Sequence, residues 1–236
     1  MKIIGLIGGM SWESTVTYYE QINQLVNQQL GGLHSAKILL ASVDFNEIEA
    51  YQRNGEWEKS GNILADEAIK LEKGGADFIL ICTNTMHKVF DQIQKKVSIP
   101  ILHIADATIA VLKEQQMKRV GLLGTKYTMQ QDFYKERIMN AKIAIFIPEG
   151  DEIDRVNDII FEELVRGVVR KESKKEYLEI IDRMIARGAQ GIILGCTEIG
   201  LLVSQEDVTV PIFDTTLIHS EQAVRESLAE IQRKGS

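Results

Sequence analysis

One α/β pattern occurs twice in the sequence, in the same order, and this repeat narrows the folds open to the chain. Four segments of the first half recur roughly 105 to 116 residues later. Residues 2–8 match 118–124, residues 36–40 match 141–145, residues 75–84 match 188–197, and residues 97–101 match 208–212. Any single pair is weak because apolar strands resemble one another. Four pairs in one order indicate two similarly folded halves.

Short β-branched runs alternate with longer amphipathic stretches through both halves. We expect strands at residues 3–7, 38–42, 78–82, 120–123, 143–147 and 191–194. We expect helices at residues 16–29, 62–73, 86–95, 106–114, 129–139, 158–166, 175–187 and 218–232. This alternation predicts the α/β class, with a mostly parallel sheet in each half and helices on both faces of it.

The third repeated segment carries the residues with the most chemistry. Residues 75–84 align without a gap to residues 188–197, which sets Cys196 opposite Thr83 and not opposite Cys82. Because successive strand residues point to opposite faces, Cys82 and Thr83 cannot both face one cleft. Ligands of open α/β sheets bind outside the carboxyl ends of the strands. We expect a pseudo-symmetric site with Thr83 on one wall and Cys196 on the other; the alternative is two unrelated turns and a core cysteine.

Composition excludes several classes of protein. The 236 residues carry a net charge of −7 and their basic residues are scattered among acids, which argues against a nucleic-acid partner. No run of 18 apolar residues is present, and the apolar N-terminal stretch is too short for a signal peptide. The two cysteines form no CxxC pair, which favours a reducing cytoplasm. The histidines at positions 34, 87, 103 and 219 lack metal-ligand spacing, so we expect no metal.

Residues 82–87 (CTNTMH) and 195–198 (GCTE) resemble the two signatures of the aspartate/glutamate racemase family, and residues 5–10 (GLIGGM) resemble its first strand and loop. The resemblance covers the whole chain and is nearest to the cytoplasmic aspartate/glutamate racemase branch. It implies a PLP-independent amino-acid racemase, an isomerase without cofactors. It also implies two pseudo-symmetric α/β domains, residues 1–103 plus 212–236 and residues 104–211, with the active site in the interdomain cleft. The implied partners are a small amino-acid or dicarboxylate substrate and a second copy of the chain in a homodimer.

The family mechanism uses two cysteines that flank the substrate α-carbon. One thiolate removes the α-proton and the opposite thiol delivers a proton to the other face. The place of the first cysteine is Thr83 here, and a hydroxyl is a far poorer base than a thiol. The resemblance therefore implies catalytic residues Cys196 and Thr83 in unequal roles, with Cys196 as the base that faces the L-enantiomer.

The carbanion formed in such a reaction needs hydrogen-bond donors aimed at the substrate carboxylate. Loop and cap residues that follow matching strands are the candidates for this binding role. They are Met10, Asn84, Thr85, Thr125, Thr128, Thr197 and Glu198. Ordinary helix capping explains such polar residues as well.

Substrate choice depends on the residue that holds the distal carboxylate. Many aspartate racemases carry an arginine and a lysine at places that fall near Glu49 and Val165 here, and neither is cationic. Gln52, with Arg53 beside it, is the nearest candidate. Two alternatives stay open: a single-cysteine decarboxylase or isomerase of the same superfamily, such as the arylmalonate decarboxylases, and a non-catalytic carboxylate-binding protein.

Overall fold

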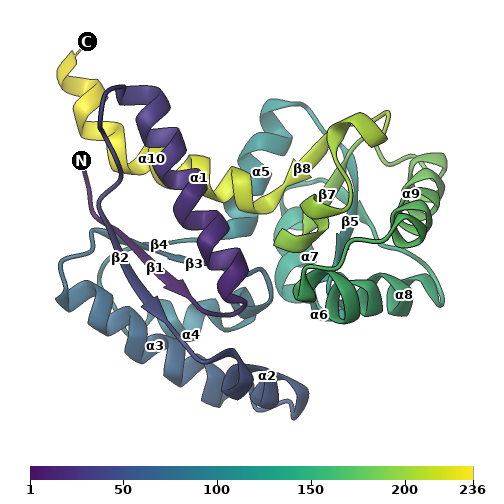
Figure 1. Ribbon diagram of the computed structural model, residues 1–236, viewed down its shortest axis with the longest axis horizontal. Coiled ribbons are helices and arrows are strands. Elements are labelled where there is room, and N and C mark those ends of the chain that lie inside the picture. The colour runs from purple at the N-terminus through teal and green to yellow at the C-terminus, as the bar shows by residue number, and fades with distance from the viewer. Residues whose placement is uncertain (236) are drawn as a thin grey trace. The chain divides into compact units, whose positions relative to one another are not determined.

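The computed structural model describes residues 1–235 and is drawn in Figure 1. The chain divides into two compact units, one made of residues 1–104 with the chain from His219 onward and the other of residues Ala105–Ile218. Each unit has one sheet of four parallel strands, in the order β2-β1-β3-β4 and β6-β5-β7-β8. The predicted α/β class with two parallel sheets flanked by helices is confirmed.

The first unit begins with a strand and is completed by the C-terminal helix. Its elements are β1 (Ile4–Gly8), α1 (Trp12–Leu30), β2 (Ile38–Ser42), α2 (Phe45–Arg53), α3 (Trp57–Lys73), β3 (Phe78–Ile81), a 3₁₀ turn (Thr85–Val89), α4 (Phe90–Gln94), β4 (Ile101–Leu102) and most of α10 (Thr215–Gly235). Figure 1 shows α1 and α10 on one face of this sheet and α3 on the other.

The second unit repeats this plan with more irregular helices. Its elements are α5 (Ile104–Glu114), β5 (Arg119–Gly124), α6 (Lys126–Gln130), α7 (Asp132–Asn140), β6 (Ala144–Phe146), α8 (Glu152–Asp158), a π-helical turn (Ile159–Glu163), a 3₁₀ turn (Leu164–Arg166), α9 (Lys171–Ala186), β7 (Ile192–Gly195), 3₁₀ turns (Thr197–Leu201 and Gln205–Asp207) and β8 (Ile212–Asp214).

The pairing of the strands preserves the sequence repeat in its central part. Gly5 pairs with Ile79 in the first sheet, and the repeat-matched Gly121 pairs with Ile192 in the second. The pairs of Ile79 with Ile101 and of Ile192 with Ile212 match in the same way. The outer strands differ: Leu39 pairs with Gly5, whereas Phe146 pairs with Gly121. Phe146 lies two residues beyond the sequence match of Leu39, a slide that keeps side chains on the same faces because strand side chains alternate with period two.

The faces of β3 decide where Cys82 lies. Phe78, Leu80 and Cys82 belong to the core cluster that also contains residues of α1 and α10. Ile79 and Ile81 belong to the cluster that contains residues of α2 and α3. Cys82 is 1% exposed. Cys82 therefore packs in the core, on the face of the strand opposite to that of Ile81.

The division between the units differs from the boundaries that the sequence suggested. We expected residues 212–236 in the first domain, but β8 pairs with β7 in the second sheet, and the chain passes to the first unit only at His219. The first boundary lies after Ile104, next to the expected position. Strand pairing keeps β8 with the second unit because its backbone hydrogen bonds are made there.

Three helices also differ from expectation. Helix α2 was not predicted; it is only nine residues long and begins where the Asp44 side chain accepts from the Asn46 N–H. The predicted helix 129–139 is two helices, because Gln131 has extended backbone angles. The predicted helix 158–166 is a π turn and a 3₁₀ turn that follow α8.

Candidate active site

Cys196 follows β7 directly, at the carboxyl end of the second sheet. It is half-buried and packs against the cluster that contains Leu194 and Tyr177. Its Sγ donates a hydrogen bond to Glu198 Oε2 at 3.0 Å. Glu198 is buried in the first turn after the strand. The thiol and the carboxylate therefore form a contact pair at this edge of the sheet.

The surroundings of Cys196 favour the neutral thiol. Burial raises the pKa of the Cys196 thiol well above its ordinary value, and the negative charges of Glu198 and Asp214 raise it further. Burial also raises the pKa of Asp214. Two carboxyl groups beside one thiol repel a thiolate, so Cys196 rests in its protonated form at neutral pH.

The end of β7 is fixed by the corner between β8 and α10. Thr215 Oγ1 donates to the Leu194 carbonyl at 2.8 Å, and Thr216 Oγ1 donates to Thr197 Oγ1 at 3.2 Å. Asp214 Oδ1 accepts from the backbone N–H of Thr216 at 2.8 Å and caps α10. The sequence analysis missed these three residues, although an aspartate followed by two threonines before a helix is a capping signal.

Thr125 and Thr128 lie at the carboxyl end of β5, next to β7 in the sheet. Thr125 is the N-cap of α6, and its Oγ1 accepts from the Thr128 N–H at 3.4 Å. The two hydroxyl oxygens are 3.2 Å apart and both residues are buried. The structure thus brings Cys196, Glu198, Thr125 and Thr128 to the carboxyl end of one sheet.

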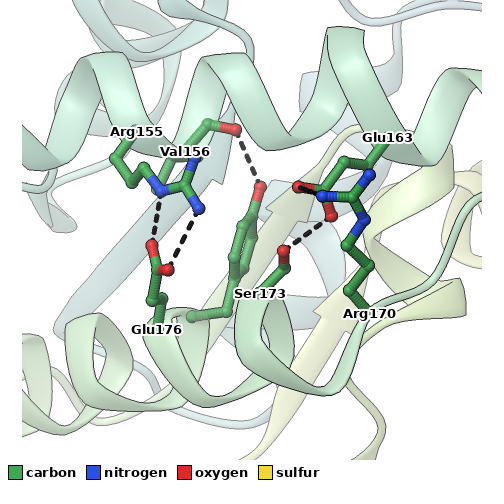
Figure 2. A network of polar contacts seen from close by, with 7 residues as sticks. Arg155, Val156, Glu163, Arg170, Ser173 and Glu176 are labelled. Carbon is green, nitrogen blue, oxygen red and sulfur yellow. Dashed lines mark hydrogen bonds and ion pairs between the residues drawn. The ribbon is translucent and has the colours of Figure 1, made fainter.

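A polar network links the helices of the core cluster against which Cys196 packs (Figure 2). Tyr177 of α9 donates to the Val156 carbonyl of α8 at 3.0 Å. Ser173 donates to the buried carboxylate of Glu163 at 2.6 Å. Arg155 and Glu176 form an exposed ion pair. These contacts hold α8, the π turn and α9 together in the layer that packs against Cys196.

Thr83 occupies the matching place in the first unit, two residues beyond the end of β3. It is half-buried, and its carbonyl lies 2.8 Å from His87 Nδ1. The backbone N–H of Ile104 donates to His87 Nε2 at 3.2 Å. Since Nε2 accepts, Nδ1 carries the proton and donates to Thr83. The His87 ring is buried against His103, with ring centroids 4.5 Å apart.

The sequence analysis considered His87 only as a possible metal ligand and missed its bond to the Thr83 turn. The spacing of four residues between a turn carbonyl and a histidine in the following 3₁₀ turn is the only sequence signal for that bond. Asn84 and Thr85 are both buried in the same turn.

Met10 lies in a tight turn that follows β1. The preceding position in this turn, Gly9, accommodates only glycine. Gly9 has φ +91°, and a Cβ there would lie 2.2 Å from the Val43 carbonyl oxygen. The Gly9 N–H donates to Thr15 Oγ1 at 2.8 Å. Met10 is buried in the cluster on the α2–α3 face.

Gln52 is buried in α2, and its Nε2 donates to Met86 Sδ at 3.0 Å. The Arg53 side chain is 69% exposed, and its guanidinium group pairs with Glu49 at 3.8 Å. Gln52 therefore contacts Met86, the residue after Thr85, whereas Arg53 lies at the surface.

Two further observations concern residues 1–235. No group of three or more His, Cys, Asp or Glu side chains in this range has the arrangement to hold a metal ion. No helix in the same range combines the length and the apolar composition needed to cross a membrane.

The comparisons with known proteins agree on one family. Residues 7–223 match the family model described as Asp/Glu/Hydantoin racemase. The broad specificity amino-acid racemase RacX of Bacillus subtilis is 24% identical over 96% of this chain and 99% of its own. The chain belongs to the Asp/Glu/hydantoin racemase family. The racemases among its relatives indicate that this protein is an isomerase.

Two crystal structures are similar over the whole chain. A protein of Yersinia pestis, provisionally named an Asp/Glu racemase, is 52% identical with a TM-score of 0.92, covering 97% of this chain and 100% of its own. An aspartate racemase homologue of Pyrococcus horikoshii is 34% identical with a TM-score of 0.86, covering 96% of this chain and 99% of its own.

Proposed function

We propose that the protein is a PLP-independent racemase of acidic amino acids in which Cys196 removes the α-proton of the L-enantiomer. The observation that carries this proposal is the position of Cys196: a half-buried thiol at the carboxyl end of β7, hydrogen-bonded to a buried carboxylate. The family match and the similarity to an amino-acid racemase support the reaction class.

Thr83 is the proposed group on the opposite face of the substrate. The matched strand registers support this pairing, because Ile79 and Ile81 precede Thr83 as Ile192 and Leu194 precede Cys196. In this proposal the carboxyl ends of the two sheets face a shared interdomain cleft. A hydroxyl at position 83 donates its proton directly or through a water and is the weaker member of the pair.

The binding residues follow from the same arrangement. Backbone N–H groups at the turns after β1, β3, β5 and β7 would hold the substrate carboxylate, with Met10, Asn84, Thr85, Thr125, Thr128, Thr197 and Glu198 in those turns. Gln52 would reach the distal carboxylate as a neutral donor. A neutral donor discriminates less between side chains than a cation does, so we expect activity on both L-aspartate and L-glutamate.

We further propose a homodimer that works in the cytoplasm without a cofactor. A dimer is expected from the resemblance of the chain to racemases, and two cysteines without a CxxC pair fit a reducing compartment.

One observation favours a second candidate. The chain has a hydroxyl, not a thiol, at position 83, and a decarboxylase needs only one protonating thiol because loss of carbon dioxide creates the carbanion. A carboxylate-binding protein without catalysis is the third candidate.

Incubation of the wild-type protein with L-aspartate or L-glutamate in D₂O separates the three. A racemase incorporates deuterium at the α-carbon, seen by NMR, and forms the D-enantiomer, seen by chiral chromatography. Carbon dioxide release from an aryl- or alkylmalonate without α-exchange would favour the decarboxylase. Binding of the amino acid without exchange or product would favour the binding protein.

A further inference from the structure

We infer that Glu198 is the proton partner of Cys196: its carboxylate takes the thiol proton and so generates the thiolate that removes the substrate α-proton. This inference rests on the proposed function, because it assigns how the base of that reaction is formed. It gives Glu198 a role beyond holding the substrate.

The geometry at the end of β7 supports a direct transfer. Cys196 Sγ and Glu198 Oε2 are 3.0 Å apart, which is a hydrogen-bond distance for sulfur. The Ile199 N–H donates to the Cys196 carbonyl at 3.2 Å and closes the turn between the two side chains. Thr216 holds the intervening Thr197. One backbone and one side-chain hydrogen bond therefore fix the turn that carries the pair, and Glu198 is buried.

The charges around Cys196 explain why a partner is needed. The titratable groups that face it are Glu198 from its own turn, Asp214 from the end of β8 and Tyr177 from α9. The side chains of Glu198 and Asp214 disfavour a thiolate, and the Glu198 backbone N–H, which favours it, is outweighed. Loss of the thiol proton to solvent would leave a thiolate next to a carboxylate. Transfer to Glu198 keeps the charge of the pair at −1 and removes that repulsion.

The proton balance of the reaction closes with this transfer. First the S–H bond of Cys196 breaks and an O–H bond forms on Glu198. The thiolate then takes the α-proton, so that the C–H bond breaks, an S–H bond forms and the electron pair stays on the substrate. A proton from Thr83 or its water enters the opposite face of the α-carbon. Glu198 finally releases its proton to solvent, which resupplies the Thr83 side and restores the starting state.

The Glu198→Gln variant separates this role from a purely electrostatic one. Its amide oxygen still accepts a hydrogen bond from the thiol, but it can neither carry the charge nor take the proton. We expect the pKa of Cys196 to fall, measured from the pH dependence of its alkylation by iodoacetamide and mapped by mass spectrometry. We also expect kcat for racemisation and for α-deuterium exchange to fall by about 10²-fold or more, with a small change in KM. Buried Cys82 makes a negligible contribution to the alkylation.

Two more variants complete the experiment. Glu198→Asp retains a carboxylate one methylene shorter, and we expect its kcat to stay within about tenfold of the wild-type value. Glu172→Gln removes an exposed carboxylate from the start of α9 and should change neither quantity. Circular dichroism identifies folded variants, and the Asp variant carries the comparison if the Gln variant does not fold.

A lower thiol pKa with unchanged or higher kcat in Glu198→Gln would overturn the inference, because Glu198 would then only repel the thiolate. An unchanged thiol pKa would also overturn it, since the two groups would not be coupled. A kcat in folded Glu198→Asp as low as in Glu198→Gln would count against proton transfer. Failure of the proposed function looks different: wild-type protein would show no α-exchange at all, whatever the alkylation of Cys196 reports.

Discussion

At the scale of single residues, the matching turns after β3 and β7 carry different reactive groups. Thr83 and Cys196 hold matching places after β3 and β7, yet one offers a hydroxyl and the other a thiol. A threonine hydroxyl is a far weaker acid than a thiol, whose ordinary pKa is about 8.5. The proposed reaction is therefore asymmetric in its kcat and KM values, although the equilibrium between enantiomers is not.

Replacing Thr83 by cysteine tests this asymmetry. In Thr83→Cys a thiol stands where the family has its first cysteine, so we expect kcat with the D-enantiomer to rise about tenfold or more, and by more than kcat with the L-enantiomer. Thr83→Ser retains the hydroxyl and should stay within a few-fold of the wild type. Initial rates in both directions by chiral chromatography measure the effect. An unchanged or lower D-side kcat in folded Thr83→Cys would contradict a weak first base.

At the scale of elements, the layer of helices behind Cys196 depends on one buried carboxylate. Glu163 lies in a π-helical turn and accepts from Ser173 at 2.6 Å, whereas Arg155 and Glu176 pair at the surface (Figure 2). Without Ser173, the buried Glu163 carboxylate keeps its desolvation penalty and retains the longer ion pair with Arg170 at 3.9 Å, whereas an exposed ion pair contributes little.

The two contacts can be compared within this network. We expect Ser173→Ala to lower the free energy of unfolding by about 1–3 kcal/mol. We expect Glu176→Gln to lower it by less than about 1 kcal/mol. Urea unfolding followed by circular dichroism measures both. Equal effects of the two substitutions would show that burial of Glu163 does not set the strength of this contact.

At the scale of the whole molecule, α10 starts in the second unit and packs on the sheet of the first through residues that include Ala223 and Leu228. His219 of this helix is fully buried. Its Nε2 donates to the Leu102 carbonyl at 2.9 Å, and the Tyr18 hydroxyl donates to its Nδ1 at 2.9 Å. Burial lowers the pKa of His219 to about 4.

This shift makes the fold sensitive to acid. The folded pKa lies below the ordinary value of 6.5, so the stability due to neutral His219 is complete above pH 6.5 and is lost as the pH falls toward 4. The loss amounts to at most about 3 kcal/mol. His219→Gln should be less stable at pH 7.5 but should lose less of its remaining free energy of unfolding between pH 7 and 5. Parallel pH dependence of the two proteins in urea unfolding would contradict the neutral, buried state.

Much of the fold could be predicted because the repeat is carried by apolar strands. Gly5 with Ile79 and Gly121 with Ile192 have matching registers in the sheets, as the alignment of the two halves implies. The shift of Phe146 by two residues could not be predicted, since a slide by two leaves the pattern of faces unchanged. Helix α2 was missed because nine residues give too few turns for a clear period.

The sequence predicts which residues the candidate site would contain, but it does not predict the hydrogen bonds that these residues make. The repeat pointed to Thr83 and Cys196. The thiol–carboxylate pair with Glu198, the bond from His87 to the Thr83 carbonyl and the capping by Asp214 depend on how turns bring side chains together after the strands end. Turn geometry of this kind leaves no periodic trace in the sequence.

The most direct test of the account is α-deuterium incorporation into L-aspartate or L-glutamate in D₂O by Cys196→Ala, compared with the wild type and with Cys82→Ser. We predict that Cys196→Ala loses exchange by at least about 10²-fold, because its base is gone. We predict that Cys82→Ser retains exchange, because Cys82 packs in the core. Exchange at the wild-type rate in folded Cys196→Ala would contradict the central claim that this thiol removes the α-proton.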